Sequence, residues 1–367
     1  MTQSLFSPLK VGALTLNNRV IMAPLTRMRA IEGDVPGPLA IEYYTQRANA
    51  GLIISEASQI SPQGKGYMST PGIYSAEQVQ GWRKVNDSVH AAGGKIAMQL
   101  WHVGRVSHHS LQINQQLPVS ASAIPYQNKT TVLGADGKPQ RVACDTPRAL
   151  RLDEIPGLLQ DYAKATENSR EAGFDMVEIH AAHGYLLHQF QSAESNHRDD
   201  IYGGSLENRA RLTLEVVDAV IAAWDAGHVG IRISPLGIFN GLNDIDGLDM
   251  GYYLAEQFAK RGLAYLHLSE PDWAGGPKLG EEFRRGLRER FPGVIIGAGN
   301  YTVEKAEDLL GKGLIDAAAF GRPYIANPDL VDRIRLGKPF AAADFDYAYV
   351  GEDKGYSDYP RWDGSPA

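Results

Sequence analysis

Residues 293–322 read GVIIGAGNYTVEKAEDLLGKGLIDAAAFGR and contain the unit that decides the fold. Two short apolar runs, at residues 293–300 and 315–322, are separated by a longer segment of helical period. Apolar runs of this length, alternating with helical segments, indicate a parallel sheet covered by helices.

The same unit recurs along the chain. Helices are predicted after each strand; for example, residues 75–93 begin with a capping pattern formed by Ser75 and Gln78, and residues 207–224 carry apolar residues on one face. Eight such units favour a closed (β/α)8 TIM barrel of the α/β class over an open, doubly wound sheet. The predicted strands are residues 19–24, 52–60, 95–102, 174–180, 228–234, 263–270, 293–300 and 315–322.

Three segments fall outside this unit. Residues 5–16 are predicted to form an N-terminal β-hairpin across the bottom of the barrel, with Gly12 at its turn. Residues 103–151 form a long excursion after the third strand, with a second hairpin turn at 134–137, and residues 345–367 form a polar, aromatic tail. Long loops after barrel strands lie at the C-terminal mouth, where barrels carry their catalytic residues. We expect one domain over residues 1–367.

Composition limits the classes of partner. The chain has 367 residues, a formal charge of −7 and no long basic run, which argues against a nucleic-acid partner. Residues 1–10 lack signal-peptide character and no apolar stretch is long enough to span a membrane, so we expect a cytoplasmic protein. We expect its partners to be small molecules, and a monomer in preference to an obligate oligomer. The single cysteine, Cys144, excludes an intramolecular disulfide and a cysteine-based metal cluster, and we expect it to be inert.

The fourth predicted strand has the most polar end, at residues 178–185. His180 and His183 would face opposite sides of a continuing strand, so they meet one ligand only if the strand ends between them, as Gly184 suggests. Two alternatives remain open from spacing alone. The histidines could satisfy loop backbone groups, or, together with His188, they could bind zinc in a TIM-barrel hydrolase, although no HExxH motif is present.

The last two predicted strands end in glycine-rich turns, Gly297-Ala-Gly-Asn300 and Gly321-Arg322. Barrels frequently bind phosphate with the loops after these strands, through accessible backbone N–H groups and an arginine. The alternative is glycine used only for turns. We predict a phosphate site here.

Three further polar residues are predicted at the same mouth. Arg232 lies between two isoleucines on the fifth strand, and a buried cation there needs a structural partner or an anionic ligand. Gln99 and Thr26 add neutral donors and acceptors. Together they suit a flat heterocycle with a hydrogen-bonding rim.

With these residues in view, the chain resembles the Old Yellow Enzyme family along nearly its whole length, and within it the bacterial N-ethylmaleimide, glycerol trinitrate and pentaerythritol tetranitrate reductases. The matching motifs lie at residues 23–29, 51–57, 99–105, 180–189, 202–209, 269–273 and 320–329.

This resemblance implies a tightly bound FMN across the barrel mouth, no metal, and NADPH or NADH as the hydride donor. It assigns to FMN the residues Ala23, Pro24, Leu25, Thr26 and Ala57 beside the ring, Gln99 and Arg232 at the pyrimidine edge, and Gly299, Asn300, Gly321 and Arg322 at the phosphate. It assigns to the aromatic substrate pocket Tyr67, Trp101, Trp273 and Tyr349.

The implied reaction is that of an ene-reductase. Hydride passes from NAD(P)H through flavin N5 to the β carbon of an activated C=C bond, while Arg232 stabilises negative charge near N1. His180 and His183 would bind the substrate oxygen and Tyr185 would protonate the α carbon, because a hydroxyl with a pKa near 10 stays protonated at pH 7. Enones, maleimides and nitroalkenes are the expected substrates, with nitrate esters as a further candidate class.

Two departures from the family pattern predict a differently shaped pocket rim. Tyr349 is followed by Val350-Gly351-Glu352 instead of several glycines, and the loop at residues 239–250 is short. A flavin-binding sensor whose turnover is incidental is a further alternative.

Overall fold

The computed structural model describes residues 4–365, so three residues of the N-terminal stretch and two of the tail considered above lie outside it. Within this range, eight parallel strands close into a barrel in the order β13, β14, β15, β16, β17, β3, β6, β8, and β8 pairs back with β13. The predicted TIM barrel is confirmed. The strands are β3 (Val20–Met22), β6 (Leu52–Ile54), β8 (Ile96–Trp101), β13 (Met176–Ala181), β14 (Val229–Ile233), β15 (Tyr265–Ser269), β16 (Val294–Ala298) and β17 (Ala317–Phe320).

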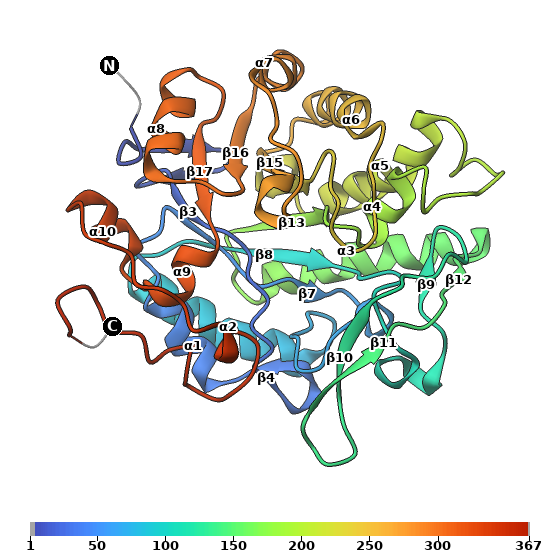
Figure 1. The fold of residues 1–367 in the computed structure, drawn as a ribbon, viewed down its shortest axis with the longest axis horizontal. Coiled ribbons are helices and arrows are strands. Elements are labelled where there is room, and N and C mark those ends of the chain that lie inside the picture. The colour runs from blue at the N-terminus through green and yellow to red at the C-terminus, as the bar shows by residue number, and fades with distance from the viewer. Residues whose placement is uncertain (1–3, 366–367) are drawn as a thin grey trace.

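Helices surround this barrel (Figure 1). In α2 the predicted capping box is present, because the Ser75 side chain accepts from the Gln78 N–H and the Gln78 side chain accepts in return. The buried residues of α2 and α5 face the barrel core, as their periodicity predicted. The helices are α1 (Pro38–Thr45), α2 (Ala76–Ala91), α3 (Ile155–Glu171), α4 (Leu186–Gln191), α5 (Leu206–Ala223), α6 (Gly247–Arg261), α7 (Glu281–Arg290), α8 (Val303–Gly311), α9 (Arg322–Ala326) and α10 (Leu330–Arg335).

The barrel interior changes character from bottom to top. The predicted hairpin, formed by β1 (Leu9–Val11) and β2 (Leu14–Leu16), packs with apolar interior residues such as Met176 and Ile296. Two positions further along β13 the interior residue is polar, because side chains alternate with period two and Glu178 lies on the same face as Met176. The bottom is therefore a hydrophobic plug, and the mouth holds the polar groups.

The excursion after β8 builds one side of the mouth. It contains β9 (Val119–Ser120), β12 (Arg148–Ala149) and the predicted second hairpin, β10 (Lys129–Leu133) with β11 (Pro139–Ala143), which extends away from the barrel in Figure 1. Short strands β4 (Ala30–Ile31), β5 (Val35–Pro36) and β7 (Ser58–Gln59) complete the loops after β3 and β6.

The C-terminal tail returns to the mouth and is held there by two arginines. Arg27 donates to the carbonyl oxygens of Ala348 and Gly355, and Arg29 donates to those of Tyr347, Ala348, Val350, Glu352 and Lys354. No helix in the described part of the chain is long and apolar enough to cross a bilayer.

Candidate active site

A cavity of about 940 Å³ opens at the C-terminal end of the barrel strands. Every residue that the family resemblance assigns to the site lines it: Ala23, Pro24, Leu25, Thr26, Ala57, Tyr67, Gln99, Trp101, His180, His183, Tyr185, Arg232, Trp273, Gly299, Asn300, Gly321, Arg322 and Tyr349.

The end of β13 brings the two histidines together. The strand stops at Ala181, His183 adopts a left-handed φ of 57°, and Gly184 follows with a φ of 71°. A Cβ at Gly184 would lie 2.7 Å from the carbonyl oxygen of Phe239, so only glycine fits this turn. The imidazole centroids of His180 and His183 are 5.3 Å apart. The predicted strand break is confirmed.

Both imidazoles are held neutral. Burial lowers the pKa of His180 and of His183 well below the ordinary value, and the charge of Arg232 adds to this effect. Nδ1 of His180 accepts the N–H of Ala182 at 3.3 Å, so the single proton of the neutral ring sits on Nε2. The Nε2 atom of His183 lies 2.8 Å from the Ser269 hydroxyl. His180 can therefore donate one hydrogen bond to an oxygen in the cavity.

Tyr185 lies beside this pair. Its ring centroid is 5.1 Å from that of His180 and 5.0 Å from that of Trp101, and its hydroxyl is 3.3 Å from the Tyr67 hydroxyl. Burial raises the pKa of Tyr185 to about 12. The hydroxyl is thus a proton donor that stays protonated across the physiological range.

A buried network of charged and polar side chains links β8, β13, β14 and β15, and its central residue, Glu178, lies two positions before His180. The Glu178 carboxylate accepts from Gln99 Nε2 at 2.7 Å and from His267 Nδ1 at 2.8 Å. Burial raises the pKa of Glu178, but His267 and Arg232 outweigh that effect and hold it below its usual value. Burial lowers the pKa of Arg232 to about 10. The pairing register places Glu178 opposite Gln99, and Arg232 opposite His180 and His267.

The turns after β16 and β17 form the other end of the cavity. Gly321 precedes α9, and the Arg322 guanidinium is exposed, with one N–H donated to the Trp273 carbonyl oxygen at 3.1 Å. Asn300 lines the cavity, but its backbone N–H and side-chain amide both donate to Asp272, at 2.9 and 2.7 Å. Gly299, Gly321 and Arg322 therefore offer the more accessible phosphate donors.

Sequence reasoning missed several members of the site. Phe239, Asn240 and Ser269 line the cavity, and the first two lie in the loop already marked as unusual. Glu178 and His267 were not assigned roles, because only strand register reveals that they pair. Tyr349 lies at the cavity rim as expected and is 50% exposed.

The zinc alternative is not supported. His188 accepts the Gly184 N–H through Nδ1 and contacts the Asp244 carboxylate through Nε2, at 3.1 Å each, so it is engaged away from the other two rings. Within residues 4–365, these three histidines do not form a group whose ligand atoms could share one ion. Cys144 is half-buried, and burial raises the pKa of its thiol to about 11, as suits an unreactive side chain.

Comparison with known proteins identifies the family. A family model described as NADH:flavin oxidoreductase / NADH oxidase matches residues 4–340. The chain belongs to this family.

Relatives within the NADH:flavin oxidoreductase family align with almost the whole chain. Morphinone reductase is 50% identical, with a TM-score of 0.97 and coverage of 99% of this chain and 97% of that one. An old yellow enzyme homologue from Zymomonas mobilis is 41% identical, with a TM-score of 0.92 and coverage of 98% and 99%. Putative 12-oxophytodienoate reductase 11 from Oryza sativa subsp. japonica is 43% identical over 98% of each chain. The resemblance to Old Yellow Enzymes is confirmed.

The residues of this NADH:flavin oxidoreductase fit FMN, the flavin of its family. Among the described residues, the buried Nε of Arg232 has no hydrogen-bond partner, and its NH2 group has only a long contact of 3.4 Å to Ser269 Oγ. Such a donor requires an acceptor, preferably an anionic one. Gln99 already gives its amide N–H to Glu178, which orients its carbonyl oxygen as an acceptor for a ring N–H. The mouth of the barrel can therefore hold a group that has hydrogen-bond acceptors facing Arg232 and a hydrogen-bond donor facing Gln99.

Proposed function

We propose that this protein is an FMN-dependent ene-reductase that oxidises NADPH or NADH and reduces C=C bonds activated by a carbonyl or nitro group. When bound, FMN supplies reversible acceptance and delivery of hydride. The observation that carries the proposal is the convergence of two neutral imidazoles and one protonated phenol on a single cavity. We also propose that the chain is cytoplasmic, in keeping with its single cysteine, and that it acts as a monomer with one FMN-binding domain.

His180 and His183 would bind the substrate oxygen. A neutral imidazole N–H withdraws electron density from the conjugated double bond without placing a competing cation in the pocket, so the β carbon becomes the electrophile. Relatives named morphinone reductase and 12-oxophytodienoate reductase agree with ketone-bearing substrates.

Tyr185 would hold the proton for the α carbon. A group with a pKa of about 12 gives up its proton only to a strong base, such as the carbanion that hydride addition creates. The Tyr67 hydroxyl at 3.3 Å is positioned to resupply that proton.

Arg232 would stabilise the negative charge that a reduced flavin carries. The nearby Glu178 carboxylate would partly offset the positive charge of Arg232 and so weaken this stabilisation. Trp101, Tyr67 and Trp273 form aromatic walls that limit water near the reacting atoms. The flat nicotinamide and the flat enone would bind one after the other between these aromatic walls. A complex of morphinone reductase with tetrahydroNAD supports a nicotinamide donor.

Anaerobic mixing tests the proposal. NADPH or NADH should bleach the yellow holoprotein, and 2-cyclohexen-1-one should restore the colour and yield cyclohexanone. Formation of cyclohexenol, or a reduced protein that the enone does not reoxidise, would refute it. Parallel reactions with N-ethylmaleimide, a nitroalkene and a nitrate ester would define the substrate classes.

A further inference from the structure

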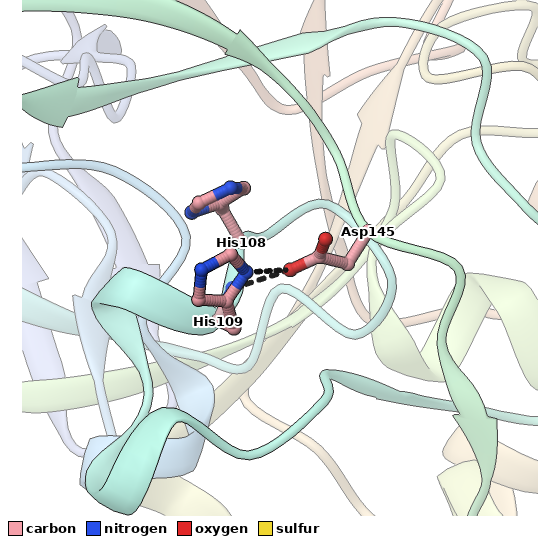
Figure 2. A group of neighbouring side chains, drawn as sticks. All are labelled: His108, His109 and Asp145. Carbon is pink, nitrogen blue, oxygen red and sulfur yellow. Dashed lines mark hydrogen bonds and ion pairs between the residues drawn. The ribbon is translucent and has the colours of Figure 1, made fainter.

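A cluster of metal-binding side chains lies outside the active site, at the base of the β10–β11 hairpin. It consists of His108, His109 and Asp145, and one ligand atom from each lies within 4.8 Å of the others (Figure 2). The two histidines lie on the excursion, where η3 (His109–Leu111) begins, and Asp145 follows the end of β11 by two residues. Residues separated by 36 positions in sequence thus converge.

The cluster is already ordered. The Asp145 carboxylate accepts both the backbone N–H of His109 and its Nδ1, at 2.5 and 2.9 Å, as the dashed lines in Figure 2 show. Nδ1 of His108 lies 2.8 Å from the Ser110 hydroxyl, and its ring centroid is 3.9 Å from that of His109. All three residues are only partly buried. An ion could therefore enter from solvent and keep water in its remaining positions.

We propose that these three residues bind a late first-row divalent transition metal. Imidazole with carboxylate is a donor set that such ions prefer. His109 Nδ1 and Asp145 Oδ2 already lie 2.9 Å apart, joined by a hydrogen bond whose proton an ion would displace when it takes both atoms as ligands.

A bound ion would link the β10–β11 hairpin to the loop after β8, because Asp145 follows the hairpin and the two histidines lie on that loop. The hairpin carries Lys129, Thr131 and Arg141 to the rim of the active-site cavity. Its base is already joined to that loop by the two hydrogen bonds between His109 and Asp145 and by the N–H of Asp145, which donates to the Ser107 carbonyl oxygen at 3.1 Å; an ion would add a ligand bond to each side. Metal binding is thus expected to order one wall of the substrate entrance.

Calorimetric titration of the tag-free holoprotein with NiCl2 tests the site. We expect one saturable Ni²⁺ per chain, at least tenfold weaker binding in His109→Gln and in Asp145→Asn, and unchanged binding in the matched control His90→Gln. His90 is a suitable control because it pairs with Asp175 at 2.9 Å but has no second histidine beside it. No saturable binding, or equal affinities in wild type and His109→Gln, would overturn the proposal.

Hydrogen exchange provides a second readout. Saturating Ni²⁺ should increase the protection of residues 129–143 in wild type and leave His109→Gln unchanged. Ni²⁺ binding without slower hydrogen exchange in residues 129–143 would refute the proposed link between the hairpin and the loop after β8. Neither measurement depends on turnover, so a failure here is distinguishable from a failure of the ene-reductase proposal.

Discussion

Replacing Tyr185 with phenylalanine removes one hydroxyl from the wall of the cavity and leaves the ring that packs at 5.0 Å from Trp101. A positioned general acid contributes about 10²–10⁴-fold in rate, or about 2.7–5.4 kcal/mol of the barrier. The Tyr67 hydroxyl lies 3.3 Å from the one removed and can pass on a proton in its place. We therefore expect Tyr185→Phe to slow the oxidative half-reaction with an enone by about 10²–10³-fold.

Anaerobic stopped-flow absorbance separates the two half-reactions. Reduction of the flavin by NADPH or NADH needs no proton from Tyr185, so its rate should change by less than about threefold. Tyr67→Phe is the matched control, since it removes the neighbouring hydroxyl but keeps the donor, and should slow reoxidation by less than about tenfold.

The pH dependence provides a further check on the same residue. Because burial raises the pKa of Tyr185 to about 12, the donor form persists as pH rises and should be lost only near that value. The wild-type rate of reoxidation should therefore not fall between pH 7 and 10. Equal slowing of both half-reactions in Tyr185→Phe would refute its role as the proton donor.

Three other substitutions test separate parts of the account. Glu178→Gln removes the negative charge that offsets Arg232, so the two-electron reduction potential of bound FMN, measured by spectroelectrochemistry, should rise by about 30 mV or more; an unchanged or lower potential would contradict this. Arg322→Ala should weaken FMN binding about 10–100-fold in titrations of the apoprotein, because a charge-assisted hydrogen bond is lost; unchanged affinity would place the phosphate elsewhere. Arg29→Ala removes hydrogen bonds to five tail carbonyl groups and should lower the free energy of unfolding by about 3 kcal/mol in urea; a loss below about 0.5 kcal/mol would show that the tail is held by other contacts.

The barrel could be predicted because each strand is buried on both faces and so appears as a short apolar run. Strand ends were less certain. The predicted strand at residues 52–60 is β6 at Leu52–Ile54, followed by a break and then β7 at Ser58–Gln59. The break occurs where Glu56 turns its carboxylate to the backbone N–H of Arg27, a contact 29 residues away that no local pattern indicates.

The cavity residues could be predicted because polar side chains at the carboxyl ends of barrel strands must share one mouth. Local sequence could not provide the register between neighbouring strands. Glu178 lies in the polar strand end at residues 178–185, but its partner His267 lies 89 positions away, and only the paired strands bring them to 2.8 Å. The same holds for His109 and Asp145. Asn300 shows the opposite case, because it lines the cavity as the sequence predicted, but the sequence could not show that its backbone N–H and its side-chain amide already donate to Asp272.

The central claim is that this cavity binds FMN and uses it to accept hydride. The most direct measurement is the visible spectrum of the purified, untagged protein, followed by heat release and identification of the chromophore and by anaerobic addition of NADPH or NADH. The account predicts a yellow protein with one FMN per chain that the nicotinamide bleaches. A colourless protein that does not take up FMN, or a bound flavin that neither nucleotide reduces, would contradict it.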